Sequence, residues 1–476
     1  MKYEVVIGLE IHVELATKSK IFCGCTTEFG GDINTHCCPI CTSMPGTLPV
    51  MNEKVVEYAA KAGLAMNCEV ANFSKMDRKN YFYPDLPKAY QISQFDLPIC
   101  KGGFVNIEIN GETKNIGITR IHIEEDAGKL LHDQSDNGSL VDYNRCGVPL
   151  IEIVSEPDMR SPEEAKAYAE KVRSILQYVG VSDCKMQEGS LRADVNLSLR
   201  PISQKKFGTR TEMKNLNSFR SIFRAAESEI KRQSRVLDEG GIIIQETRRW
   251  DDDSGRSHSM RSKEEAHDYR YFPEPDLVPI ELSDEIINEY RESLPELPYE
   301  RFKRYTAKLG IPEYDAKLIT ASVKTADFFE DAVSAGANPK TASNWIMGDL
   351  MRLMKEVDTE DIPFEGSLLN ALIELIEKGT ISNNIAKTVF TDMFKTGRTP
   401  QDIVKDKGLE VLSDAGELEQ VVDKIIDANP KSVDDYIRGK QKAIGFLMGQ
   451  VMKETRGKAN PQMINKMLRE KLESLK

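Results

Sequence analysis

Residues 120–158 read RIHIEEDAGKLLHDQSDNGSLVDYNRCGVPLIEIVSEPD, and they are the most informative part of the chain. Among apolar residues they carry five side chains of the types that bind metal ions: His122, Glu124, Glu125, Asp126 and Glu152. Carboxylates among β-branched residues must be paired, protonated or bound to a cation, because an isolated buried charge is too costly. The stretch therefore predicts either a salt-bridged sheet edge or a site for a hard metal ion.

The composition of the 476-residue chain is that of an ordinary globular protein, with 40% hydrophobic and 29% charged residues. No apolar run approaches the roughly 18 residues of a membrane span, and the first residues, MKYEVVIGLE, lack the apolar core of a signal peptide. We therefore expect a cytoplasmic protein. Its nine cysteines argue against a disulfide framework and for metal ligands or free thiols.

The charge is unevenly distributed along the chain. The net charge is −12, but residues 431–476 hold 11 Lys and Arg against 5 Asp and Glu, a balance of +6, which leaves −18 for the remainder. An acidic body with a basic tail is typical of a protein whose one end binds a polyanion.

Residues 4–15 alternate between apolar and polar side chains, as a strand with one buried face does. Glu10 and His12 project from its polar face, about 7 Å apart along the strand. Taken alone, a Glu-x-His pair is more often an ordinary exposed face than a site. It gains weight because it resembles the polar face of the 120–126 run.

Two later stretches, 190–200 and 209–215, alternate in the same way. Their polar faces combine acids, bases and an amide: Arg192, Asp194, Asn196, Arg210, Glu212 and Lys214. Asn110-Gly111, between two alternating runs, predicts a hairpin that feeds the 120–126 run. A single sheet with such a face would form a cradle in which carboxylates bind a cation and Arg or Lys bind an anion.

The remaining patterns are mainly helical. Residues 52–66 and 161–179 predict helices, while the polar segment 246–279 is expected to be rich in loops and to end the run of strands. The predicted fold is α+β: an antiparallel-sheet catalytic cradle in residues 1–293, followed by two all-helical domains, 294–400 and 401–476.

Two pairs of cysteines are joined by a short loop, and they resemble a zinc knuckle: Cys23, Cys25, Cys38 and Cys41. Four thiolates would leave no open coordination position, so this zinc would be structural and would hold a loop together. The alternative is a set of reduced thiols without metal.

Residues 76–94, MDRKNYFYPDLPKAYQISQ, combine tyrosines with Lys79 and Lys88 in a non-periodic stretch. These side chains could stack a base and hold phosphates, or they could cover the core. The residues alone favour neither.

Four stretches carry a resemblance to a known family: IGLEIHVEL (7–15), KNYFYPDLPKAYQISQ (79–94), VDYNRCGVPLIEIVSEP (141–157) and GKQKAIGFLMGQVMKETRGKANP (439–461). The chain resembles the GatB family, the B subunits of bacterial aspartyl/glutamyl-tRNA amidotransferases, over essentially its whole length. The resemblance implies a cradle similar to glutamine synthetase and a YqeY-like tail domain. It also implies that the protein uses ATP and Mg²⁺ to phosphorylate the side-chain carboxylate of Glu on tRNA(Gln) or Asp on tRNA(Asn). Ammonia from a GatA partner would then give the amide, with GatC tethering the pair.

The resemblance implies three magnesium positions, and the polar strand faces and the basic tail add further candidates. Magnesium positions would be Glu10, His12 and Glu125, and candidates for a second cation, or for orienting the first, are Glu124, Glu152, Asp194 and Glu212. Candidates to hold ATP phosphates or the substrate carboxylate are Lys79, Arg192, Asn196, Arg210 and Lys214, with structural ion pairs as the alternative for the charged ones. Candidate tRNA-binding residues in the tail are Lys440, Lys442, Lys453, Arg456 and Lys458.

Two other functions compete with this interpretation. A synthetase that amidates a free amino acid would fit the cradle, but a small substrate needs no basic tail. A non-catalytic, tRNA-binding scaffold protein would use the acidic face only to stabilise the sheet.

Overall fold

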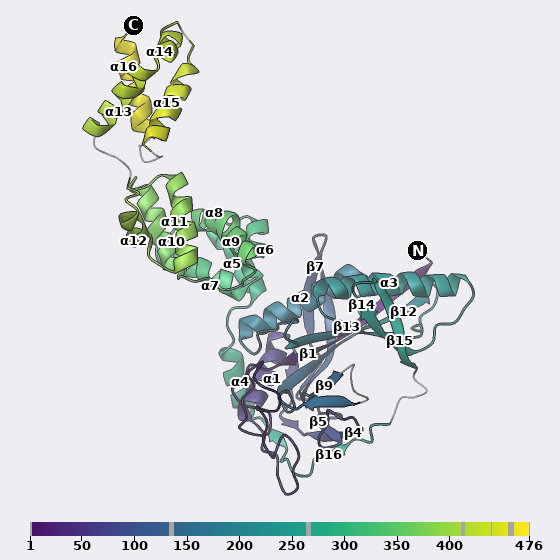
Figure 1. Cartoon of the computed structure of the whole chain (residues 1–476). Coiled ribbons are helices and arrows are strands. Elements are labelled where there is room, and N and C mark those ends of the chain that lie inside the picture. Colours follow the sequence, from purple (N-terminus) through teal and green to yellow (C-terminus); the bar gives the residue numbers. More distant parts are fainter. Residues whose placement is uncertain are drawn as a thin grey trace. The chain divides into compact units, whose positions relative to one another are not determined.

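The computed structural model describes residues 2–132, 138–262, 268–410, 415–438, 440–455 and 461–475. The chain forms two compact units, Met1–Pro298 and Tyr299–Lys476. The first unit combines a large sheet with helices, and the second is helical (Figure 1). The α+β class is therefore confirmed. The further division of the second unit at residue 400 stays a prediction.

The strands of the first unit are β1 (Tyr3–Glu14), β2 (Glu69–Val70), β3 (Phe73–Ser74), β4 (Asp77–Asn80), β5 (Tyr90–Ser93), β6 (Cys100–Lys101), β7 (Phe104–Ile109), β8 (Glu112–Glu125), β9 (Lys129–His132), β10 (Ser139–Asp142), β11 (Pro149–Ser155), β12 (Leu191–Pro201), β13 (Thr211–Leu216), β14 (Glu246–Asp251), β15 (Arg256–Ser262), β16 (Phe272–Pro273) and β17 (Ile280–Glu281). Its helices are α1 (Glu53–Ala65), α2 (Pro162–Val179), α3 (Phe219–Asp238) and α4 (Asp284–Glu292).

Within the described residues, ten strands form the main sheet in the order β15-β14-β13-β12-β1-β11-β8-β6-β2, with β7 paired to β8. Its pairs are antiparallel apart from β13 and β14, which run parallel. The sheet is therefore mixed, and the prediction of a purely antiparallel sheet is wrong at this one pair. The reason is that α3 follows β13 and returns the chain, so that β14 starts at the same end.

The apolar face of the sheet is covered by helices. The alternating residues of β1 from Val5 to Val13 are at most 8% exposed, and α1, α2 and α3 contact the strands (Figure 1). The helices predicted at 52–66 and 161–179 are present as α1 and α2, and the Asn52 and Ser161 side chains accept hydrogen bonds from their first turns. Because the helices cover one face, the polar side chains of the strands gather on the other.

The segment 246–279 was expected to be rich in loops, but β14 and β15 lie within it and extend the sheet. Trp250 and Thr247 are the buried side chains of β14, at 1% and 9% exposure, while its Arg248 and Arg249 are polar. A strand with so few apolar residues has no clear period-2 signal, and this is why the sequence pattern missed it.

The second unit contains α5 (Pro298–Leu309), α6 (Glu313–Thr320), α7 (Val323–Ser334), α8 (Pro339–Trp345), a π-helical turn (Ile346–Leu350), α9 (Met351–Val357), α10 (Gly366–Glu377), α11 (Asn383–Thr396), α12 (Pro400–Asp406), α13 (Ala415–Ala428), α14 (Pro430–Ile437), α15 (Ala443–Glu454) and α16 (Pro461–Ser474). The last four helices share a core that includes Leu447 and Val451 of the basic tail. None of the described helices is long and apolar enough to span a membrane.

Candidate catalytic site on the polar face of the sheet

Strand register brings the predicted site residues into rows. His12 of β1 lies opposite Glu152 of β11 and Arg192 of β12, and Glu152 in turn lies opposite His122 of β8. One step along β1, Glu10 lies opposite Asp194. Residues far apart in the chain thus meet on four neighbouring strands.

The first group, here called the His12 cluster, consists of His12, Glu124 and Glu152. One ligand atom from each lies within 4.8 Å of the others. His122 joins the two carboxylates, since its Nε2 lies 3.0 Å from Glu124 Oε1 and 3.3 Å from Glu152 Oε2. Ser93 Oγ donates a further hydrogen bond to Glu124 Oε1 at 2.7 Å.

The carboxylates of the His12 cluster are held in their charged form. Burial alone would raise the pKa of Glu124, but the hydrogen bond with His122 and the field of Lys79 lower it to about 2. Burial likewise opposes the charge of Glu152, but hydrogen bonds with His12 and His122 hold its pKa well below its usual value. Burial lowers the pKa of His122, and the same contacts raise it to about 9. The cluster is therefore a buried pair of anions neutralised by nearby histidines.

The second group, the Glu10 cluster, consists of Glu10, Asp194 and Glu212, whose ligand atoms also lie within 4.8 Å of one another. Asn196 Nδ2 donates to Glu10 Oε1 at 3.0 Å. Lys214 Nζ lies 2.5 Å from Asp194 Oδ2 and 3.0 Å from Glu212 Oε1. Lys214 is therefore in an ion pair with the acids of this cluster.

Both clusters suit a hard cation. Each offers carboxylate oxygens that converge from different strands, and Mg²⁺ commonly takes one or two carboxylates and keeps several waters. A histidine nitrogen is a less usual ligand for it, since hard cations prefer oxygen. The donor sets therefore fit magnesium, with His12 as the least typical member.

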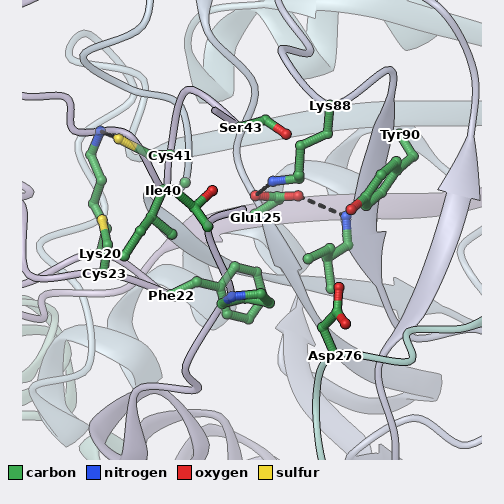
Figure 2. Close-up of a pocket in the computed structure, with 14 residues that line it drawn as sticks. Lys20, Phe22, Cys23, Ile40, Cys41, Ser43, Lys88, Tyr90, Glu125 and Asp276 are labelled. Atoms are coloured by element: carbon green, nitrogen blue, oxygen red, sulfur yellow. Dashed lines mark hydrogen bonds and ion pairs between the residues drawn. The ribbon is translucent and has the colours of Figure 1, made fainter. Parts of the chain in front are cut away.

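Glu125 belongs to neither cluster, which differs from its predicted place as a magnesium ligand. Its Oε2 lies 2.6 Å from Lys88 Nζ, and its Oε1 accepts from the backbone N–H of Ile92 at 2.8 Å. The pair lies on the wall of a cavity of about 50 Å³ that Cys23 and Cys41 also line. Figure 2 shows these side chains around the cavity. Glu124, one residue earlier, is the glutamate of β8 that lies in the His12 cluster.

Arg192 is also engaged within the protein. Its Nη1 and Nη2 donate to the two oxygens of Asp126 at 3.2 and 2.7 Å. Asp126 also lies beside Glu14, and burial followed by the charge of Asp126 raises the pKa of Glu14 to about 8. Arg192 therefore forms a structural ion pair, which was the alternative to a role in holding phosphate or the substrate carboxylate.

A second cavity, of about 240 Å³, opens beside the Glu10 cluster. Glu10, Asn196, Arg210, Phe207 and Gly8 are among its lining residues. Arg210 is exposed at its rim. The cavity has room for part of a nucleotide, with an aromatic ring, an amide and a guanidinium available for contacts.

The four predicted cysteines do converge, with their sulfurs within 4.8 Å of one another. The Sγ atoms of Cys38 and Cys41 lie 3.9 Å apart, close to the roughly 3.8 Å expected of thiolates 2.3 Å from a tetrahedral zinc. Hydrogen bonding from Cys23 lowers the pKa of Cys41 to about 5, helped by the charge of Lys20. The donor set fits zinc, and His36 and Cys37 lie outside it.

In the tail, Lys440, Lys442 and Lys453 are exposed, and Lys440 pairs with Asp435 at 2.9 Å. Arg456 and Lys458 lie outside the described residues.

The sequence pattern singled out His122 and Lys88 but not their roles, which are to link the carboxylates and to pair with Glu125. It missed Tyr269 and Tyr271 beside Lys79 altogether. The two tyrosines come from the segment that was expected to be rich in loops. Their alternation around Arg270 is visible in the sequence, but nothing there indicates that this segment pairs with β4.

The sheet and its acid-lined face belong to a known class of catalytic domain. Residues 5–288 match the GatB/GatE catalytic domain, and residues 327–472 match the GatB domain. The chain is 62% identical, over the full length of both proteins, to the B subunit of the aspartyl/glutamyl-tRNA(Asn/Gln) amidotransferase of Caldicellulosiruptor bescii. It is also 62% identical, over 99% of its length and the whole of the relative, to the corresponding B subunit of Thermoanaerobacter sp. strain X514. The chain therefore belongs to the GatB family.

Proposed function

We propose that this chain carries out the ATP- and Mg²⁺-dependent step of tRNA-dependent amidation. It would phosphorylate the side-chain carboxylate of Glu on tRNA(Gln), of Asp on tRNA(Asn), or of both, and ammonia would then convert the acyl phosphate to the amide. The observation that carries this proposal is the pair of carboxylate clusters on one sheet face, within the segment that matches the GatB/GatE catalytic domain. The names of its relatives, as amidotransferase B subunits, support it.

The chemistry explains why such a face is needed. A carboxylate is a poor electrophile, so the γ-phosphoryl group of ATP is transferred to one of its oxygens, with release of ADP. Attack of ammonia on the carbonyl carbon then breaks the C–O bond and releases phosphate. Catalysis of both steps is mostly positioning and charge neutralisation. A bound Mg²⁺ would neutralise charge on the phosphoryl oxygens.

The chain's own residues would divide these tasks. His12, Glu124 and Glu152 would hold one cation, and Glu10, Asp194 and Glu212 a second. Asn196 and Arg210 would contact ATP in the cavity beside the Glu10 cluster, and Lys214 would stay close to the phosphates. Lys79 would donate to an oxygen of the phosphoryl group or of the substrate carboxylate. Arg192 would act indirectly, by fixing Asp126.

The other parts of the chain would support this reaction. The cysteine cluster would hold a structural zinc that staples residues 23–41. Residues 401–476 would form a YqeY-like tail domain that binds the tRNA, and the cradle would be distantly similar to glutamine synthetase. We further propose that a GatA-type amidase supplies the ammonia and that a GatC-type protein tethers it. The site of action would be the cytoplasm, where aminoacyl-tRNA is used.

Mg²⁺-dependent ADP formation by the complex with its partner proteins tests this function. We expect misacylated tRNA to stimulate ADP formation, free glutamate or aspartate not to do so, and Asp194→Asn to lose it. Glu112→Gln, which removes an exposed carboxylate on the β7–β8 hairpin, is the matched control and should keep full activity. A complex that binds tRNA but never consumes ATP would instead support the non-catalytic scaffold.

A further inference from the structure

Lys79 differs from the other two lysines of the site in how its charge is held. Lys88 forms an ion pair with Glu125 at 2.6 Å, and Lys214 forms one with Asp194 at 2.5 Å. Among the residues that the structure describes, the Lys79 ammonium makes neither a hydrogen bond nor an ion pair. It lies instead over two aromatic rings, with its Nζ 5.1 Å from the Tyr269 centroid and 5.8 Å from the Tyr81 centroid.

This ammonium nevertheless lies within the field of two carboxylates. Burial would lower the pKa of Lys79, but the charges of Glu124 and Glu152 raise it overall, so the side chain is a cation. A flexible lysine near two anions would normally move into direct contact with one of them, as Lys88 and Lys214 do. Something must therefore keep Lys79 apart.

The ring of Tyr269 comes from residues 269–274, here called the tyrosine arm. The arm is fixed to the strand that carries Lys79: Asn80 donates from its backbone N–H to Tyr269 O at 2.9 Å and from Nδ2 to Arg270 O at 2.8 Å. Within the arm, β16 (Phe272–Pro273) pairs with β4. The position of the ring thus depends on the same strand as the lysine.

A buried ion pair fastens the far end of the arm. Arg78 Nε and Nη2 donate to the two carboxylate oxygens of Glu274 at 2.7 and 2.8 Å, and the Glu274 side chain is fully buried. Tyr271 stacks on Phe95 with ring centroids 4.3 Å apart, and its edge-to-face contact with Tyr269 spans 6.1 Å. The arm is therefore held at both ends and along its rings.

We propose that the tyrosine arm is a positioning device that keeps the Lys79 ammonium available for an oxyanion of the substrate. This proposal rests on the proposed function and names Tyr269 as a positioning residue for it. An aromatic face attracts a cation without using its N–H donors. The three donors of Lys79 thus remain for a phosphoryl or carboxylate oxygen, while Glu124 and Glu152 remain for a metal ion.

A double-mutant cycle in the assembled complex tests the proposal. Tyr269→Leu should lower kcat about tenfold, which corresponds to ~1.4 kcal/mol, with the KM for tRNA unchanged. Tyr269→Phe keeps the ring and should stay within about twofold of the wild type. Tyr314→Leu, the same change at an exposed tyrosine of the second unit, is the control. In a Lys79→Met background, Tyr269→Leu should cause no further loss, because the arm acts through that lysine.

Mn²⁺ binding to the isolated chain gives a readout that does not depend on activity. Without the ring, the freed ammonium pairs with Glu124 or Glu152 and competes with the cation, so Tyr269→Leu should weaken Mn²⁺ binding several-fold and Lys79→Met should restore it. The proposal would be overturned if Tyr269→Leu lowered kcat by the same factor in the Lys79→Met background as in the wild type. It would also be overturned if Tyr269→Leu left the Mn²⁺ affinity unchanged. A wild-type complex that forms no amide would refute the proposed function instead, and the Mn²⁺ comparison would then decide the role of the arm.

Discussion

The substitution Glu125→Gln tests whether Glu125 serves as the partner of Lys88, as seen here, or as the magnesium ligand that the family resemblance suggested. The Glu125 side chain is 3% exposed and that of Lys88 11%, with 2.6 Å between their charged atoms. Removing one partner of a buried pair typically costs about 3–5 kcal/mol, because the other charge is left uncompensated. The adjoining cavity can admit water, so we expect the free energy of unfolding to fall by about 3 kcal/mol, at the lower end of this range. Glutamine still accepts the hydrogen bond from Ile92, so the backbone contact should survive.

The double variant Glu125→Gln/Lys88→Met should recover most of this loss, since no charge remains unpaired. Urea unfolding followed by Trp250 fluorescence measures the first unit alone when Trp345, the other tryptophan, is replaced by phenylalanine. Glu125→Gln should also keep Mn²⁺ binding at both clusters, whereas Glu124→Gln should lose the cation of the His12 cluster and keep that of the Glu10 cluster. Additive costs of the two single substitutions would refute the ion-pair argument. Loss of Mn²⁺ binding in Glu125→Gln would show instead that Glu125 is a metal ligand.

Three further predictions concern the zinc, the tail and the pH dependence of stability. Metal analysis should find about one zinc per chain, which Cys38→Ser/Cys41→Ser abolishes; zinc-free protein prepared without chelator would contradict this. Deleting residues from 401 onward should raise the KM for tRNA strongly and flatten the salt dependence, by about 0.7–0.9 of the log–log slope for each lost phosphate contact; unchanged values would show that the tail serves another purpose. Folded Glu14, with its pKa raised to about 8, keeps a proton that the unfolded chain releases near pH 4.5, so stability falls as pH rises through this window. Glu14→Gln should remove a slope of about 1.4 kcal/mol per pH unit from urea unfolding between pH 5 and 8, and parallel curves for variant and wild type would exclude Glu14 as its source.

Period-2 alternation was enough to place Glu10 and His12 on the polar face of β1, because it depends only on neighbouring residues. The same rule distinguishes the two adjacent glutamates of β8. Glu124 lies two residues after His122 and therefore on the same face of the strand, while Glu125 lies on the opposite face. Following alternation there would have placed Glu124, and not Glu125, on the face of His122, where the structure has it.

Strand order and register could not be derived from such local patterns. His12 meets Glu152 across 140 residues of chain, and Tyr269 meets Lys79 across 190, because of pairings that no local pattern encodes. The polar strands β14 and β15 were missed for the same reason: their neighbours in the sheet, not their own residues, define them.

The most direct test of the central claim follows an oxygen atom through the reaction. Glutamate labelled with ¹⁸O in its side-chain carboxylate is loaded on tRNA(Gln) and amidated by the complex with ATP and Mg²⁺. If the carboxylate is activated as an acyl phosphate, attack of ammonia breaks the C–O bond, and each amide formed should yield one inorganic phosphate that carries a single ¹⁸O. Amide formation accompanied by unlabelled phosphate would contradict the account.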